Sequence, residues 1–265
     1  MALAYYLSSI PTLLRGVQNP IGTALGLLLN RRPVTLALRD GTRFHIRSAM
    51  DAWIVKETCL DKDYEHIAIT IEDGWTVVDI GAGMGDFAVS VAYTHPHCRV
   101  YAYEPFPESF ALLQENVALN RVTNVVPVQR GVSGVGGSLV LALTGAAVQH
   151  STSVEPIKQT HNSTNIPIES VSLEQLLADI VVCDFLKIDC EGAEFDILLN
   201  ASPLALSKIR CLALEYHDGV TPHSHHDLAA FLQSHGFDVI SRANPVHPSL
   251  GLMSARRIPP GEPQS

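Results

Sequence analysis

Hydrophobic positions along the chain follow two spacings, which predict strands alternating with helices. Short β-branched apolar runs at residues 76–80 and 99–103 are typical of strands buried on both faces of a parallel sheet. The segments that follow them, 87–92 and 107–120, carry apolar side chains at helical spacing. This order of strand, helix, strand and helix predicts an α/β domain built on a mostly parallel sheet.

The alternation continues through the second half of the chain. Ser172 and Gln175 form the pattern of a capping box at the start of a predicted helix over residues 173–179. Two apolar runs, at 237–240 and 250–253, predict a closing antiparallel pair of strands. Further strands are expected at 124–129, 139–143, 166–171, 185–188 and 210–214, and further helices around Phe195 and at 227–235.

The first 70 residues follow a different pattern and predict an extension to this domain. The apolar first 30 residues predict one or two helices broken at prolines. Asp40-Gly41 lies between two strand patterns, 34–38 and 43–47, and predicts a β-hairpin. A helix is expected over residues 51–64. The expected organisation is an N-terminal extension of helices and a hairpin at 1–70, a catalytic-type α/β domain at 71–258 and a disordered tail at 259–265.

A polar stretch at residues 144–165 interrupts the regular alternation. It is rich in Ser, Thr, His, Gly and Asn and has little periodicity. A structureless segment of this length inside a compact domain is usually functional or disordered. A flap that faces the substrate and plain disorder are therefore both open.

Composition and charge narrow the class of function. The 265 residues are 46% apolar, which is enough for a substantial core. The net charge of −9, from 27 acidic and 18 basic residues, argues against a phosphate-neutralising surface, so no nucleic-acid partner is expected. The five cysteines form no C-x-x-C pair and favour a reduced, cytoplasmic setting.

The apolar N-terminus raises the question of a membrane. No uncharged apolar run reaches the ~18 residues that a membrane helix needs, so no stable membrane insertion is expected. Residues 1–14 lack a preceding basic region, which argues against a cleaved signal. This segment is suited to a homodimer contact, and binding to a membrane surface is an alternative.

The most informative stretch is residues 75–86, W-T-V-V-D-I-G-A-G-M-G-D. Gly81, Gly83 and Gly85 follow the strand at two-residue spacing. Glycine is required where a backbone turns sharply and a ligand approaches closely, because a Cβ would block both. The next helix would present its N-terminus to that ligand. The pattern therefore predicts a nucleotide pocket.

The neighbouring carboxylates indicate which nucleotide binds. Asp86 replaces the third glycine of a dinucleotide fingerprint and would repel a pyrophosphate, which also disfavours a nicotinamide-dependent oxidoreductase. S-adenosylmethionine (SAM) has no phosphate, and its sulfonium and ammonium groups suit Asp79 and Asp86. Glu104 stands nineteen residues after Gly85, the separation at which a carboxylate reaches ribose hydroxyls. SAM is the expected cofactor, and another adenine nucleotide is the alternative.

A second informative stretch, F-L-K-I-D-C-E-G-A-E, covers residues 185–194. Asp189 and Glu191 follow its strand, and Glu215 and His217 follow the next strand. In open α/β sheets, ligands lie outside the carboxyl ends of the strands. These four side chains are therefore expected to converge on one site beside the nucleotide pocket.

Three further side chains could influence this site. Lys187 lies in an apolar strand, where an unpaired ammonium would be costly, so it is expected to pair with a carboxylate such as Asp79 or Asp189. Glu57 and Tyr64 precede the first strand, where segments often cover the edge of the cofactor. For these two, a solvated helix face and a core position are the favoured interpretations.

At this level of detail the chain resembles the FkbM-type methyltransferases. The matching motifs run in the family's order over residues 34–220: the Asp40-Gly41 hairpin, V-V-D-I-G-A-G-M-G, Y-E-P at 103–105, V-S-L-E-Q-L at 171–176 and F-L-K-I-D-C-E-G-A-E. The family more often has asparagine where Gly83 stands, and glycine, being less hindered, leaves cofactor binding intact. The resemblance implies a Rossmann-like seven-stranded class I methyltransferase sheet and SAM-dependent O-methylation of a hydroxyl on a sugar, polyketide or related secondary metabolite.

The candidate site residues fall into two groups. Cofactor-binding candidates lie in the glycine turn or at the end of the second strand, namely Asp79, Gly81, Ala82, Gly83, Gly85, Asp86, Glu104, Pro105 and Phe106. The catalytic candidates follow the two later strands, namely Asp189, Glu191, Glu215 and His217.

A hydroxyl is a poor nucleophile, so a base or a metal at the acceptor oxygen should assist the transfer. We expect Asp189 or His217 to take the proton, with Glu191 and Glu215 orienting the base or the substrate. The same four side chains could instead form an oxygen-rich Mg²⁺ or Mn²⁺ site. A non-catalytic SAM-binding or interaction module is the other alternative.

Overall fold

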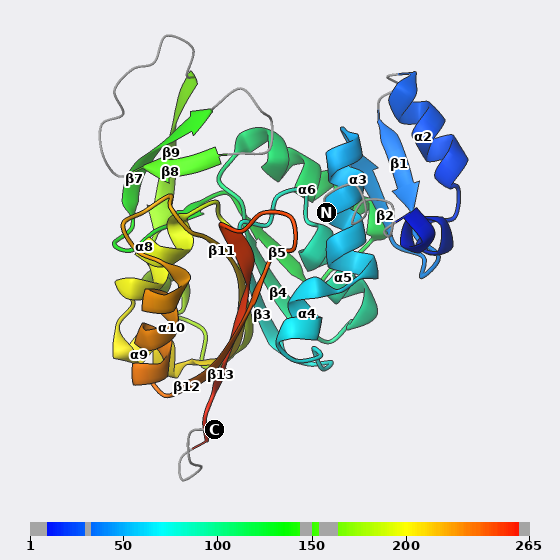
Figure 1. Cartoon of the computed structure of the whole chain (residues 1–265). Coiled ribbons are helices and arrows are strands. Elements are labelled where there is room, and N and C mark those ends of the chain that lie inside the picture. The colour runs from blue at the N-terminus through cyan, green and yellow to red at the C-terminus, as the bar shows by residue number, and fades with distance from the viewer. Residues whose placement is uncertain (1–9, 30–32, 144–149, 154–163, 260–265) are drawn as a thin grey trace.

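The computed structural model describes residues 10–29, 33–143, 150–153 and 164–259 (Figure 1). Its centre is a seven-stranded sheet in the order β12-β13-β11-β10-β3-β4-β5. Neighbouring strands are parallel except for β13, which is antiparallel to both β11 and β12. The strands span β3 Thr76–Ile80, β4 Arg99–Tyr103, β5 Val125–Val128, β10 Cys183–Ile188, β11 Ile209–His217, β12 Phe237–Ala243 and β13 Leu250–Arg257. This order confirms the predicted seven-stranded sheet with its closing antiparallel pair.

Helices cover both faces of this sheet, because the central strands are apolar on both sides. Val78 and Ile80 pack in a core cluster with the helices of one layer, whereas the preceding Val77 packs with the other layer. The first layer contains α7 Leu173–Leu176, α8 Ala193–Leu199, α9 Pro203–Ser207 and α10 His225–Ser234. The second contains α4 Asp63–Ile67, α5 Asp86–Thr94 and α6 Pro107–Asn120.

The N-terminal extension packs on the outside of the second layer (Figure 1). It contains α2 Pro20–Leu28, the hairpin β1 Val34–Ala37 and β2 Arg43–Ile46, α3 Ala49–Val55 and the π-helical turn η1 Lys56–Leu60. Phe44 of the hairpin shares a buried cluster with Met84 and Leu112. Side chains of α6 also fix the hairpin, since Asn116 Oδ1 accepts the His45 N–H at 2.7 Å. The predicted domain boundary therefore lies within a continuous core, and the division itself stays a prediction.

Several predicted elements differ from the observed ones. The helix expected over 51–64 is interrupted at Lys62, which has a positive φ of 52°. The helix expected over 173–179 ends at Leu176, although its predicted capping box between Ser172 and Gln175 is confirmed. The structure also contains α9 and two strands, β6 and β8, which the sequence pattern did not predict.

A second sheet of four strands lies beside the main one. Its order is β6-β9-β7-β8, with β6 Gly131–Val132, β7 Gly137–Leu143, β8 His150–Ser153 and β9 Thr164–Val171. The strands expected at 139–143 and 166–171 are thus present, and they pair with each other rather than with the seven-stranded sheet. Strand β8 falls inside the polar stretch 144–165, most of which lies outside the described residues, as does the tail from 260 onward.

None of the helices in the described ranges combines the length and the apolar character needed to cross a bilayer.

Candidate active site

The turn after β3 depends on three glycines, each for a different physical reason. All three have positive φ, from 54° to 82°, a region that L side chains rarely adopt. A Cβ on Gly81 would lie 1.7 Å from the backbone oxygen of Asp189, and one on Gly85 would lie 2.3 Å from Leu113. A Cβ on Gly83 would meet no atom within 4 Å, since this glycine faces a cavity. The turn therefore brings two strands together and leaves open space above Gly83.

The open space above Gly83 is a cavity of about 280 Å³, here called the smaller cavity. Glu104 lies at its wall and is held by two backbone donors, the N–H of Gly83 and that of Phe106, each at 2.8 Å. Burial raises the pKa of Glu104 to about 7 despite these hydrogen bonds, and burial raises the pKa of Asp86 to about 6. The lining includes Arg47, Trp53, Gly81, Gly83, Met84, Asp86, Glu104, Pro105, Phe106, Ser109, Lys187 and Glu191.

Asp79 lies beneath this cavity rather than in its lining. It is fully buried, and its Oδ1 accepts a hydrogen bond from Lys187 Nζ at 2.8 Å, which confirms the expected partner for that lysine. Burial raises the pKa of Asp79, against the lowering effect of the lysine. Lys187 Nζ also donates to the carbonyl oxygen of Gly81 at 3.2 Å. Asp79 thus fixes the lysine and the glycine turn, and its expected contact with a cofactor stays a prediction.

A second cavity of about 480 Å³, here called the larger cavity, adjoins the first. It is formed by η1, α4, the end of β11 and the turn between β12 and β13. Its lining includes Thr58, Asp61, Asp63, Tyr64, Arg242, Asn244, Pro245 and Leu252. Four residues line both cavities, namely Ile54, Glu57, Asp189 and Glu215. The two spaces therefore meet at a junction that contains three carboxylates.

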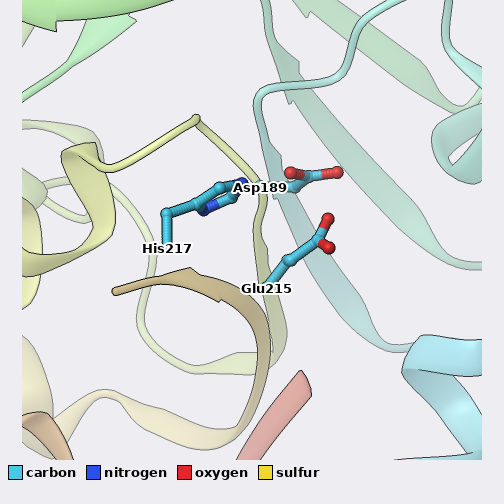
Figure 2. Close-up of side chains that lie close together, drawn as sticks. All are labelled: Asp189, Glu215 and His217. Carbon is cyan, nitrogen blue, oxygen red and sulfur yellow. The ribbon is translucent and has the colours of Figure 1, made fainter. Parts of the chain in front are cut away.

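Asp189 and Glu215 lie at this junction, and His217 lies close to both of them (Figure 2). One ligand-capable atom from each lies within 4.8 Å of the others. Tyr64 donates its hydroxyl to Asp189 Oδ2 at 2.8 Å, and burial raises the pKa of Tyr64, which keeps it a donor. Burial, followed by the charge of Asp189, raises the pKa of Glu215 to about 8. At neutral pH, Glu215 is thus mainly protonated beside Asp189.

His217 stands behind the junction and lines neither cavity. Its Nδ1 lies 3.1 Å from Glu194 Oε1, and its Nε2 lies 3.5 Å from Glu191 Oε2. Burial alone would lower its pKa, but the hydrogen bond and charge of Glu194, with the neighbouring carboxylates, raise the pKa to about 9. His217 is therefore an imidazolium at neutral pH, and it stabilises the carboxylates around it.

The proton on His217 affects whether these side chains could bind Mg²⁺ or Mn²⁺ instead. Asp189, Glu215 and His217 are the one group of three such side chains close enough to share an ion within the described part of the chain. A histidine must lose its proton to bind a metal, and the raised pKa of His217 opposes that. The donor set of this structure therefore fits a hydrogen-bonded carboxylate site better than a metal centre.

Most of the predicted site residues line one of the two cavities. Those that do are Gly81, Gly83, Asp86, Glu104, Pro105, Phe106, Asp189, Glu191 and Glu215. Asp79, Ala82, Gly85 and His217 support the lining from behind. Asp189 does not cap the following helix, because the N-cap position of α8 is Gly192. Its side chain is left to face the junction.

Sequence reasoning missed the residues that the extension contributes. Arg47 lines the smaller cavity and is held by Asp51, with Nε and Oδ2 3.2 Å apart. Tyr64 lies in the core as expected, and its hydroxyl also binds Asp189. Glu57, for which a solvated face was favoured, lines both cavities. The only signal was their place just before the first strand of the α/β domain. Arg242, near the end of β12, and Asn244, in the turn after it, belong to no recognisable sequence motif.

Comparison with known proteins identifies the family. The model of the methyltransferase FkbM domain matches residues 79–239, more than half of the chain. The 31-O-demethyl-FK506 methyltransferase FkbM of Streptomyces tacrolimicus is 25% identical over 241 residues, covering 80% of this chain and 92% of that protein. Methyltransferase sdnD of Sordaria araneosa is 25% identical over 251 residues, covering 82% of this chain and 95% of that protein.

Among solved structures, the methyltransferase FkbM of Methylobacillus flagellatus superposes with a TM-score of 0.48 at 16% identity, covering 77% of this chain and 53% of that one. The family match agrees with the strand order of the seven-stranded sheet and with the glycine turn after β3. The chain therefore belongs to the FkbM family of SAM-dependent methyltransferases and has the class I, Rossmann-like methyltransferase fold.

Proposed function

We propose that this protein transfers the methyl group of SAM to a hydroxyl oxygen of a sugar, polyketide or related secondary metabolite bound in the larger cavity. The observation that carries the proposal is the junction, where the two cavities share Asp189 and Glu215. Methyl transfer needs donor and acceptor to approach in line, which two adjoining pockets allow. The Streptomyces relative is named as a 31-O-demethyl-FK506 methyltransferase, which supports oxygen as the acceptor atom.

The residues of the smaller cavity fit SAM. The open space above Gly83 lets a ligand lie against the backbone, and the Glu104 carboxylate can accept hydrogen bonds from two ribose hydroxyls. Pro105, Phe106 and Met84 offer an apolar wall for an adenine ring. When bound, SAM supplies an electrophilic methyl group on a positively charged sulfonium. The carboxylates of the junction suit that charge.

Within this proposal, Asp189 is the proton acceptor. Its carboxylate faces both cavities, and the hydroxyl of Tyr64 fixes its orientation at 2.8 Å. His217, the other base considered from the sequence, is already protonated at neutral pH because its pKa is about 9. Glu215, with a pKa of about 8, carries a proton and can donate a hydrogen bond to the acceptor oxygen. Asp189 thus takes the hydroxyl proton as the sulfonium charge is lost.

The decisive experiment combines cofactor binding with methyl transfer in the purified protein. We expect S-adenosylhomocysteine, the demethylated product, to bind in a calorimetric titration with or without EDTA, and NADH to give no heat. A panel of glycosides and polyketide alcohols then identifies an acceptor. Binding that requires Mg²⁺ would favour the metal-assisted alternative, and absence of binding would refute the assignment of the smaller cavity.

Substitution of Asp189 tests the base. Asp189→Asn keeps the shape of the side chain but cannot accept the proton, so kcat should fall about 10²–10⁴-fold while S-adenosylhomocysteine affinity changes only a few-fold. Glu115→Gln is the matched control, because Glu115 is an exposed residue of α6 that lines neither cavity. Full activity in Asp189→Asn would remove Asp189 from its proposed role.

A further inference from the structure

The N-terminal extension exposes an apolar surface that the active site does not explain. On α2, the side chains of Ile21, Leu25 and Leu28 are 73%, 51% and 81% exposed, and Leu29 beside them is 60% exposed. Their spacing of four, three and one residues places them on one face of the helix. In the preceding helical stretch, Ile10 and Leu14 are also exposed and stand four residues apart. We call Ile10, Leu14, Ile21, Leu25, Leu28 and Leu29 the outer N-terminal face.

This face points away from the core that holds the helix in place. The inner side of α2 packs on β1, where a Cβ on Gly26 would lie 3.3 Å from Val34, and Thr23 is buried. Figure 1 shows α2 at the outer edge of the molecule, with β1 on its inner side. The side chain of Asn19 accepts the Gly22 N–H at the start of the helix, and Pro20 occupies its first turn. The helix is therefore anchored from one side only, and its outer side chains are free of the core.

The charge of the same segment is opposite to that of the whole protein. The first 39 residues contain no acidic residue and contain four arginines, Arg15, Arg31, Arg32 and Arg39. The complete chain, by contrast, carries a net charge of −9. Arg15 and Arg39 are exposed, and the Arg39 N–H donates to the carbonyl oxygen of Gly16, next to Arg15 in the chain. A surface that is apolar and basic on an otherwise acidic protein attracts anionic partners.

We propose that the outer N-terminal face docks the protein on an anionic lipid surface. Amphipathic helices that lie in the plane of a membrane insert apolar side chains at the headgroup boundary, while nearby arginines bind anionic headgroups. The nine-residue α2 is far too short to span the bilayer, so the docking is peripheral. A second copy of the chain fits less well. A two-fold contact through this face would bring the arginines of both copies toward each other, with the exposed Asp40 as the nearest acidic residue in sequence.

Vesicle co-sedimentation tests the proposal and does not depend on the proposed function. The full-length protein should bind vesicles of phosphatidylcholine with about 30% phosphatidylglycerol, bind pure phosphatidylcholine much less, and lose affinity as salt rises. The double variant Leu25→Ser/Leu28→Ser should lower the partition coefficient at least about tenfold. Arg15→Gln/Arg39→Gln should weaken binding to the anionic vesicles alone. Both variants should keep the wild-type circular dichroism and S-adenosylhomocysteine affinity, because the changed side chains are exposed.

The matched control changes an equally exposed apolar residue elsewhere. Leu204 is 73% exposed on α9, on the opposite side of the molecule in Figure 1, so Leu204→Ser should bind vesicles like the wild type. Equal vesicle binding by the wild type and Leu25→Ser/Leu28→Ser would overturn the proposal, as would absence of binding. Sedimentation as a dimer that the same double variant dissociates, without vesicle binding, would assign the face to a second copy instead.

Discussion

The two cavities of the active site are built in different ways. The smaller one is bounded on one side by the glycine turn at 81–86 and the end of β4, and side chains such as Arg47, Trp53 and Lys187 complete its lining. Its buried carboxylate Glu104 is held by two backbone N–H groups. The larger one is made by side chains from η1, α4, β11 and the β12–β13 turn, which are distant in sequence. Its carboxylate Asp189 is held by the side chain of Tyr64.

This difference indicates how cofactor and acceptor recognition can evolve separately. A pocket built on a glycine turn requires a few glycines at fixed spacing, because glycine allows both the turn and the close approach of a ligand. A pocket formed by side chains from scattered segments can change its shape by single substitutions without altering the turn. Asp189 and Glu215 line both cavities, so a substitution at either residue would affect both pockets.

The largest effect is expected from substitutions in the glycine turn of the smaller cavity. Gly81→Ala would place a Cβ 1.7 Å from the Asp189 oxygen at a φ of 75°, so it should destabilise the fold by roughly 3 kcal/mol and abolish S-adenosylhomocysteine binding. Gly83→Ala, which meets no atom, should cost about 1 kcal/mol yet still lose cofactor affinity. Gly74→Ala, at a φ of 90° in open space, should cost a similar 1 kcal/mol or so and keep the affinity. Denaturant unfolding and calorimetry measure both quantities, and normal binding by Gly81→Ala would contradict the account of this turn.

The next effect concerns the carboxylate of the smaller cavity. Because the pKa of Glu104 is about 7, and the ionised form accepts both ribose hydroxyls, affinity for S-adenosylhomocysteine should rise roughly tenfold between about pH 6 and pH 8. The sign follows from linkage, since a ligand that prefers the ionised carboxylate loses affinity as pH falls through the pKa of the free protein. Glu104→Gln should bind more weakly and with a flat pH profile. A steep profile in that variant would assign the titration to another group, with Asp86 as the first candidate.

The larger cavity should respond differently when Tyr64 loses the hydroxyl that holds Asp189. Tyr64→Phe keeps the ring that packs edge-on against Phe87 but removes the donor to Asp189, so kcat should fall roughly tenfold. S-adenosylhomocysteine affinity and thermal stability should stay near the wild-type values, which a purely structural role would not predict. A variant that loses cofactor affinity as strongly as kcat would show that the two cavities are not separable at this residue.

The smallest expected effect is a change in the alkaline pH profile. Glu215 faces Asp189, Glu191, Glu57 and the imidazolium of His217, and its pKa is about 8. Its protonated form donates to the acceptor oxygen, so kcat should fall a few-fold as pH rises above about 8. Glu215→Gln retains a donor without a titrating proton and should remove this decline. An alkaline decline that persists in Glu215→Gln would assign it to deprotonation of His217 near pH 9.

Much of the architecture could be predicted from the sequence, because local patterns specify it. The apolar β-branched run of β3 indicates a strand buried on both faces, and the glycines after it indicate a turn of positive φ that other residues rarely adopt. Glu104 follows from the fixed length of one strand-helix-strand unit. Each of these features depends on residues that are close together in the chain, so the sequence alone can predict it.

The tertiary structure alone decided the roles of the charged side chains. The sequence proposed Asp189 or His217 as the base, but it could not show that buried Glu194 packs against His217 and, with neighbouring carboxylates, raises the pKa of His217 to about 9. Asp79 is predicted as a cofactor contact, and only the tertiary structure shows that it is fully buried and paired with Lys187. The larger cavity, with Tyr64, Arg242 and Asn244, exists only where segments separated by about 180 residues meet. Burial and long-range contacts set the pKa and orientation of each group, and no local pattern in the sequence records them.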